Sequence, residues 1–178
     1  MSVPFEMTTK NLSGHWALNK LLSDNTESAL ALQGVSWITR KALNKAPVSI
    51  TISQYIDQDG IYHLNTTQQA LGRMVVQKAI LDGKAIDLDH PLFGKVTILQ
   101  AWTSLSAIET EFLREGSQDG PQEVIEMKIF HKSDGWQSHQ VFGIELIDGK
   151  RRHTRRMIVR NGSTVSRTRL VYDWKGVD

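Results

Sequence analysis

Residues 12–47 read LSGHWALNKLLSDNTESALALQGVSWITRKALNKAP and carry the clearest structural signal in the chain. The triplet Gly-His-Trp at positions 14–16 stands at the head of a strand-like run. Several helix-capping residues follow, and a short helix is expected to end near Gly34. Ser36 can cap a second helix, which must stop before Pro47. The stretch therefore predicts a strand, two short helices and then another strand.

The rest of the chain reads almost entirely as strands. Val48, Ile50 and Ile52 alternate with polar residues, which is the pattern of a strand with one apolar face. Asp-Gly and Asn-Gly pairs, which are strong hairpin signals, separate several of the later runs. With the first strand included, the expected strands cover residues 12–22, 48–53, 61–69, 74–81, 95–103, 108–114, 124–131, 137–146, 152–160 and 164–173.

An even succession of hairpins closes most easily into a barrel, because closure removes the exposed edges of the sheet. We therefore predict a mainly β protein, a single ten-stranded up-and-down antiparallel β-barrel with a helix-turn-helix lid between the first two strands. A barrel of that size is wide enough to hold a small ligand. Residues 1–11 are expected to be a flexible N-terminal segment, and residues 12–178 are expected to form the barrel domain.

The composition argues against several other classes of protein. The 178 residues carry a formal charge of +2 and no cysteine, so neither a polyanionic partner nor thiolate chemistry is indicated. The chain shows no apolar run near the ~20 residues needed to cross a bilayer and no secretory signal. We therefore expect a cytoplasmic protein that does not bind nucleic acid.

Three short segments resemble one group of ligand-binding barrels. They are Leu12-Ser13-Gly14-His15-Trp16, the block LQGVSWITRK at residues 32–41, and the final Thr168-Arg169-Leu170-Val171-Tyr172. Together with the strand count, they make the chain similar to the calycin superfamily, and specifically to the lipocalin-like intracellular fatty-acid-binding proteins. The chain also resembles small fungal calycin-like proteins, some relatives of which sit among natural-product genes.

The resemblance implies structural roles for Gly14 and Trp16. In calycins the tryptophan of the Gly-x-Trp triplet packs across the barrel floor against an arginine of the last strand. Arg167 or Arg169 is therefore expected to form a structural cation-π contact with Trp16.

The resemblance also implies a ligand clamp on the last strand, and here the chain departs from the family. Fatty-acid-binding proteins usually hold the ligand carboxylate with an Arg-x-Tyr pair, whose two side chains share one face of the strand. Arg169 and Tyr172 are three residues apart, so a regular strand points them to opposite faces. Both stay candidate ligand-binding residues, but we expect a specialised ligand in place of a plain fatty acid.

Polar residues on the middle strands are candidates for chemistry inside the barrel. His63 and Asn65 share one face of their strand, and His131 shares an apolar face with Met127. A histidine pKa of about 6.5 suits a general acid or base, although a lone histidine on an apolar face is more often a satisfied core residue. His131 and His63 are the catalytic candidates. The further ligand-binding candidates are Trp37, Asn65, Trp102 and Met127.

The run from Lys150 to Arg156 concentrates positive charge at the shoulder of one expected hairpin. Alternation places Arg155 and Arg156 on opposite faces, so one of the two is expected to point into the barrel. A buried arginine needs a partner, either an inward glutamate or an anionic or enol-bearing ligand. Arg155 is therefore a ligand-binding candidate, and His153 is expected to be a solvated surface residue.

Motifs for metals and cofactors are weak. Asp87 to His90 resembles a string of metal ligands, but without a second cluster it is expected to be a polar turn. We find no phosphate loop, dinucleotide fingerprint or nucleophile elbow in the sequence. The sequence therefore predicts no metal site, and any catalysis is expected to be cofactor-free.

Two classes of function stay open. The first is binding of a hydrophobic or amphipathic small molecule, such as a specialised lipid, polyketide or terpenoid, behind a lid that Arg40, Lys41 and Lys45 could steer to an acidic membrane surface. The second is a cofactor-independent cyclase or isomerase of natural-product biosynthesis, which folds a reactive substrate in the same cavity. Such an enzyme needs mainly shape, exclusion of water and a few hydrogen-bond or acid-base groups from His, Arg or Tyr.

Overall fold

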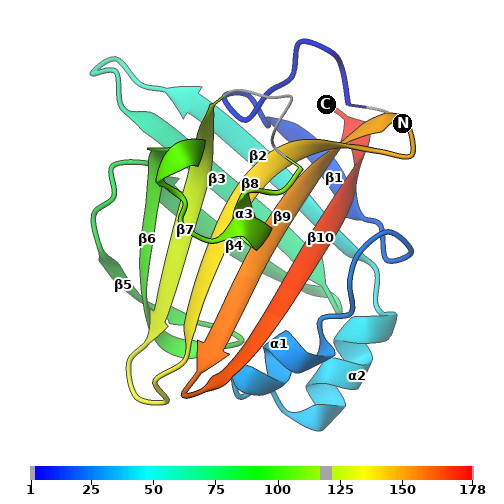
Figure 1. Ribbon diagram of the computed structural model, residues 1–178, viewed down its shortest axis with the longest axis vertical. Helices are drawn as coiled ribbons and strands as arrows, with labels where there is room; N and C mark the ends of the chain where they lie inside the picture. The colour runs from blue at the N-terminus through cyan, green and yellow to red at the C-terminus, as the bar shows by residue number, and fades with distance from the viewer. Residues whose placement is uncertain (1–2, 117–121, 178) are drawn as a thin grey trace.

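The computed structural model describes residues 3–116 and 122–177. Within these residues, ten antiparallel strands form one curled sheet with two helices across one end (Figure 1). The strands are β1 (Gly14–Leu18), β2 (Val48–Ile56), β3 (Tyr62–Ala70), β4 (Arg73–Ile80), β5 (Ile86–His90), β6 (Gly94–Ser104), β7 (Glu123–His131), β8 (Gln137–Ile147), β9 (Lys150–Asn161) and β10 (Thr164–Gly176). The predicted fold class is confirmed.

Strands that follow one another in sequence lie side by side, and β1 also pairs with β10. The resulting order is β4-β3-β2-β1-β10-β9-β8-β7-β6-β5, an up-and-down meander whose first and last strands join. In that joint Trp16 lies opposite Trp174, and Leu18 lies opposite Tyr172. The contact brings the two ends of the chain together and makes the sheet continuous there.

A seam runs between β4 and β5, which are the two edges of the sheet. It is bridged by the isolated backbone pair Asp82 with Ala101. Beside that pair, Gln77 Nε2 donates a hydrogen bond to Gln100 Oε1 at 3.3 Å. Because a few contacts replace a full ladder, the seam is the weakest line in the barrel wall.

Each strand turns one set of side chains into the barrel and the other set outward. On β2, Ile50 and Ile52 are each 2% exposed, while the residues beside them are exposed. Strand pairing carries the same inward face around the sheet. The large apolar side chains of the interior include Trp16, Leu64, Ile125, Trp136 and Phe142.

The two helices of the lid stand where the sequence predicts them. They are α1 (Glu27–Leu32) and α2 (Trp37–Lys45), between β1 and β2. The Ser36 hydroxyl accepts a hydrogen bond from the backbone amide of Thr39 at 3.3 Å, which confirms the expected cap of α2.

The lid packs on the barrel through its first helix. Ala29 of α1 is fully buried against Met157 and Val159 of β9. Arg40 Nε binds Glu27 Oε1 at 2.8 Å and so ties α2 to α1. In the part of the chain that the structure describes, no helix is both long and apolar enough to cross a membrane.

One expected strand is wrong. In place of a strand at residues 108–114, the chain forms a short 3-10 helix, η1 (Leu105–Ala107), and a short α-helix, α3 (Glu111–Arg114). Ile108 and Leu113 are 1% and 0% exposed, and they pack with Val124, Val141 and Ile158 on the outer face of β7 to β9. Their apolar pattern therefore serves to cover a sheet and not to extend it.

The tenth strand is instead β5, in a segment where we expected only a polar turn at Asp87 to His90. Its register with β6 sets Leu88 opposite Val96, and Leu88 packs against the main core. Asp87 and Asp89 face solvent, so the short strand alternates polar and apolar residues like the longer ones.

The N-terminal segment packs against the barrel, which corrects the expectation of a flexible tail. Val3 and Met7 are 3% and 6% exposed and belong to the main core. Arg151 donates hydrogen bonds to the backbone carbonyls of Phe5 and Met7 at 2.8 and 2.6 Å. Apolar burial and an arginine anchor therefore hold this segment in place.

Trp16 takes the structural position that the Gly-x-Trp triplet implies, but with other partners. Its ring centroid lies 4.8 Å from that of Trp174 and 5.2 Å from that of His153. The expected cation-π contact with Arg167 or Arg169 is wrong, because the register of β10 points both arginines outward. An aromatic stack, and not an arginine, closes this part of the interior.

Gly14 is expected to tolerate no side chain. Its φ is +138°, and a Cβ there would collide with the ring of Trp174. Gly14→Ala should therefore lower the free energy of unfolding by about 3 kcal/mol, through backbone strain and overpacking together. Gly60→Ala is the matched control, since its φ is +76° and no atom lies near its Cβ position. This control should lose about 1 kcal/mol in urea unfolding, and equal losses in both variants would contradict the close packing at Gly14.

Candidate functional site

The strand register separates the candidate residues into inward and outward sets. Leu64 of β3 is 1% exposed and points inward, so His63 and Asn65 on either side point outward. His63 stacks on Tyr55 with ring centroids 4.7 Å apart, and its Nε2 lies 2.7 Å from Asp57 Oδ2. His63 and Asn65 therefore lie outside the barrel interior, contrary to their selection as site residues.

Trp37 and Arg169 also lie outside the interior. Trp37 is 63% exposed at the start of α2. Arg169 is on the outer face of β10, with Nη1 3.8 Å from Glu145 Oε2. Tyr172 points the opposite way, as its spacing from Arg169 predicts, and it is 3% exposed.

His131 faces inward, but both of its ring nitrogens already have partners. Nε2 donates to the carbonyl of Phe93 at 2.8 Å, and Nδ1 accepts from the amide of Asp134 at 2.9 Å. The ring also lies 5.4 Å from that of Trp136, beside the turn that leads into β8. The arrangement is that of a satisfied core histidine and leaves no ring nitrogen for a substrate.

Arg155 is the arginine of the basic run that points into the barrel. Its Cζ lies 4.3 Å from the ring centroid of Phe142 and 5.9 Å from that of Tyr172. Arg156 points outward and binds Glu145 at 2.8 Å. Among the described residues, no carboxylate pairs with Arg155, and its Nε has no hydrogen-bond acceptor. Arg155 is half-buried, and a cation that contacts only aromatic faces among the described residues keeps unused hydrogen-bonding capacity.

His153 is the candidate that sequence reasoning missed. We expected a solvated residue, but it is 0% exposed on the inner face of β9, two positions from Arg155. Its Nδ1 lies 3.0 Å from the carbonyl oxygen of Gly143, and because a carbonyl only accepts, Nδ1 carries the ring proton. Nε2 is then an acceptor, with no partner in the described part of the chain. The alternation of side chains along the strand could have indicated this position, because His153 shares a face with Arg155, which was already a candidate to point inward.

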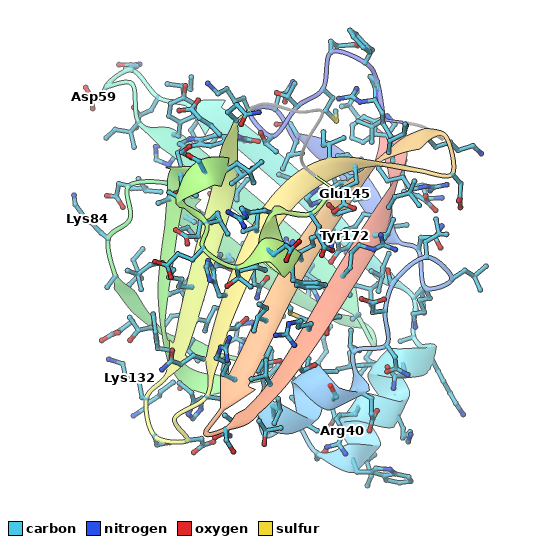
Figure 2. The ribbon with its side chains drawn as sticks, viewed as in Figure 1. Arg40, Asp59, Lys84, Lys132, Glu145 and Tyr172 are labelled. Carbon is cyan, nitrogen blue, oxygen red and sulfur yellow. The ribbon has the colours of Figure 1, made fainter. Side chains whose placement is uncertain are left out.

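His153, Arg155 and Tyr172 form a group that we call the interior polar cluster. Burial, with a smaller effect from the charge of Arg155, lowers the pKa of His153 to about 3. Burial raises the pKa of the Tyr172 phenol above its ordinary value, against the opposing effect of Arg155. Both rings are therefore neutral near pH 7, and Arg155 is the charged member. Figure 2 shows Tyr172 on β10, in the half of the barrel away from Arg40 on the lid.

Trp102 and Met127 also face the interior, as the sequence predicts. Met127 is 5% exposed, and its sulfur accepts a hydrogen bond from Gln100 Nε2 at 3.3 Å. The indole N–H of Trp102 is buried without an acceptor among the residues described. The interior wall thus combines apolar surface with a few polar atoms that point inward.

Two hollows differ in size and in position. A cavity of about 20 Å³, enough for one water molecule, lies at the seam and is lined by residues that include Gln77, Leu88 and Gln100. A hollow of about 320 Å³ lies outside the barrel near His139, on the face that α3 partly covers. Neither of these two hollows is lined by His153, Arg155 or Tyr172.

Comparison with known proteins identifies relatives along almost the whole chain. Pericyclase pydY from Acremonium sp. is 32% identical over 182 residues, which cover 99% of this chain and 98% of that protein. The probable pericyclase scpY from Mollisia scopiformis is 32% identical over 180 residues, which cover 98% of this chain and 95% of that protein. No protein-family model matches the chain.

Several solved structures have a similar fold. Fatty-acid-binding protein 1 from Echinococcus granulosus has a TM-score of 0.56 at 15% identity, covering 92% of this chain and 96% of that one. The fluorescent protein UnaG has a TM-score of 0.58 at 17% identity, covering 92% and 97%. Zebrafish ileal bile acid-binding protein, solved with cholic acid, has a TM-score of 0.54 at 14% identity, covering 92% and 98%. These likenesses confirm the calycin-like fold.

The neutral, buried His153 is expected to make the protein less stable in acid. Its pKa is about 3 in the folded chain and 6.5 ordinarily, so the unfolded chain binds the additional proton between these values. Stability should therefore fall as the pH falls from 6.5 toward 3, by about 1.4 kcal/mol per pH unit from this group. Urea unfolding at pH 7, 6 and 5 should show a steeper loss for the wild type than for His153→Phe. Equal slopes would refute a neutral buried histidine.

Proposed function

Because the chain belongs to the family of fungal pericyclases that includes pydY, we propose that it catalyses a pericyclic cyclisation of a hydrophobic natural-product precursor. The substrate binds inside the barrel, folded toward the shape that ring closure needs. A pericyclic reaction moves electrons around one ring of atoms in a single step. The protein therefore has to supply conformation, a dry environment and polarisation, and it does not have to transfer a group.

The apolar interior supports the conformational part of this proposal. A flexible polyene loses much freedom on reaching the geometry of ring closure, and a prepared site can supply up to roughly 7–11 kcal/mol by holding reacting atoms in place. Trp16, Ile125 and Phe142 are each 1% exposed or less, and all three stand on paired strands. Such walls are rigid enough to select one folded shape.

The observation that carries the proposal is Arg155, a cation in an apolar barrel whose Nε has no acceptor among the described residues. Its guanidinium can donate hydrogen bonds to a carbonyl oxygen conjugated with the reacting double bonds. That donation withdraws electron density and lowers the barrier to addition of an electron-rich diene. Charge-assisted hydrogen bonds are strong in apolar surroundings. The neutral phenol of Tyr172 stands beside Arg155 and can support the same oxygen.

Binding without reaction is the second candidate function, and the fold shared with fatty-acid-binding proteins favours it. A carrier uses the same interior and the same arginine, but it releases its ligand unchanged. The two functions therefore differ in turnover and not in the place where the ligand lies.

Turnover is measured with an organic extract from a culture of the source organism in which this gene is deleted. Purified protein is added, and the products are followed by liquid chromatography with mass spectrometry. A pericyclase converts a precursor into an isomer of equal mass over many turnovers, because no atoms are gained or lost. A stoichiometric complex with unchanged ligand supports the carrier instead.

In the same assay, Arg155→Met should lower kcat/KM by about 100-fold, the usual cost of losing one preorganised donor. Methionine keeps much of the apolar volume and removes the charge. The matched control is Arg167→Met, which changes an exposed arginine on the outer face of β10 and should leave the rate unchanged. A normal rate in Arg155→Met would exclude polarisation by this residue.

We also propose that the lid contacts a membrane surface transiently when the ligand is exchanged. Leu21, Trp37 and Ile38 are 97%, 63% and 74% exposed. Lys20 Nζ donates to the carbonyl of Asn44 at 2.7 Å, which holds the loop with Leu21 beside α2. Exposed apolar side chains next to lysines are typical of surfaces that lie in a lipid headgroup layer.

The double variant Trp37→Ser, Ile38→Ser should bind vesicles of phosphatidylglycerol at least about tenfold more weakly than the wild type in co-sedimentation, because it loses two large apolar anchors. Ile56→Ser is the control, since Ile56 is 55% exposed at the end of β2 that lies far from the lid. If both proteins bind as the wild type does, the lid is not the contact surface.

A further inference from the structure

The interior polar cluster contains an acceptor as well as donors, and this narrows the class of substrate. Arg155 can only donate hydrogen bonds, whereas His153 Nε2 can only accept one in its present tautomer. We infer that His153 is a specificity-determining residue that accepts a hydrogen bond from an N–H or O–H group of the substrate, next to the carbonyl oxygen that Arg155 binds. A carboxamide and the enol of a 1,3-dicarbonyl carry this pattern. The inference rests on the proposed binding site and does not depend on turnover.

The tautomer of His153 is held by the fold. Nδ1–H donates to the carbonyl of Gly143 on the neighbouring strand β8 at 3.0 Å. The ring is packed between aromatic side chains, 5.2 Å from Trp16, 5.3 Å from Tyr172 and 6.0 Å from Phe142 between ring centroids. A ring flip would break the bond to Gly143 and would have to displace this packing. Nε2 is therefore the nitrogen that His153 presents to the interior.

The acceptor and the donor are close enough to share one small polar group. His153 and Arg155 are two positions apart on the same face of β9, a separation of about 7 Å along the strand. Both side chains pack against Tyr172, the imidazole by stacking and the guanidinium with Cζ 5.9 Å from the ring centroid. A carbonyl and an adjacent N–H or O–H can therefore reach both residues at once.

A ligand without a hydrogen-bond donor is expected to bind more weakly, because it leaves Nε2 of His153 unpaired. Nε2 belongs to a residue that is 0% exposed, so binding a purely apolar or acceptor-only group there leaves a buried acceptor unsatisfied. A buried polar group without a partner costs free energy, so a site binds more weakly any analogue that lacks the hydroxyl or amide to pair with it. We expect a preference of about tenfold for a ligand with the donor.

The test compares decanamide with 2-undecanone, which have the same chain and differ in NH2 against CH3 beside the carbonyl. Dissociation constants are measured from tryptophan fluorescence, since Trp16 packs on His153. The ratio of the ketone constant to the amide constant should fall about tenfold from the wild type to His153→Phe. The control His139→Phe changes a half-buried histidine on the outer face, bound to Glu126 at 2.6 Å, and should keep the wild-type ratio.

A second measurement does not depend on the folding of a variant. In wild-type protein with ¹⁵N-labelled histidine, decanamide should move the Nε2 resonance of His153, and 2-undecanone should not. An unchanged resonance, or equal ratios in the wild type and His153→Phe, overturns the inference, and so does failure of the wild type to bind either compound. These readouts need no reaction, so loss of turnover in the extract assay refutes the proposed catalysis and leaves this preference standing.

Discussion

The pairing of β1 with β10 is the contact on which the rest of the barrel depends. It joins the first strand to the last, so that Trp16 and Trp174 meet inside and Gly14 leaves room for the second ring. Once this register is set, every other strand in the meander inherits its inward face, because a slip of one residue would turn all of its side chains around. The positions of His153 and Arg155 follow from that joint through the ladder between β9 and β10.

Much of the fold could be predicted from local patterns, because each pattern fixes the backbone over a few residues. The cap at Ser36 and the Asp-Gly and Asn-Gly turns act over a few residues, and the structure contains them. Residues 108–114 were wrongly predicted to be a strand. Their apolar side chains cover the outer face of the sheet, and a segment that does this has the same apolar composition as a strand. The segment at Asp87 is short and acidic, so only its pairing with β6 reveals it as a strand.

The candidate site was predictable only in part, because alternation says which residues share a face and not which face points inward. Arg155 and Arg156 were equivalent until the ladder placed one inside and paired the other with Glu145. The same choice carried His153 inward, although its basic neighbours suggested solvent. His131 was placed on the correct face, but the bonds that its ring makes to Phe93 and Asp134 come from turns that the pattern does not describe.

The seam between β4 and β5 can open without loss of the fold. Parting the edges there breaks the bridge of Asp82 with Ala101 and the bond between Gln77 and Gln100, while the ladders elsewhere stay intact. Local openings of this kind cost far less than global unfolding and occur much faster. Substitutions at the seam can therefore change how often it opens, while the aromatic joint of β1 and β10 holds the rest of the barrel together.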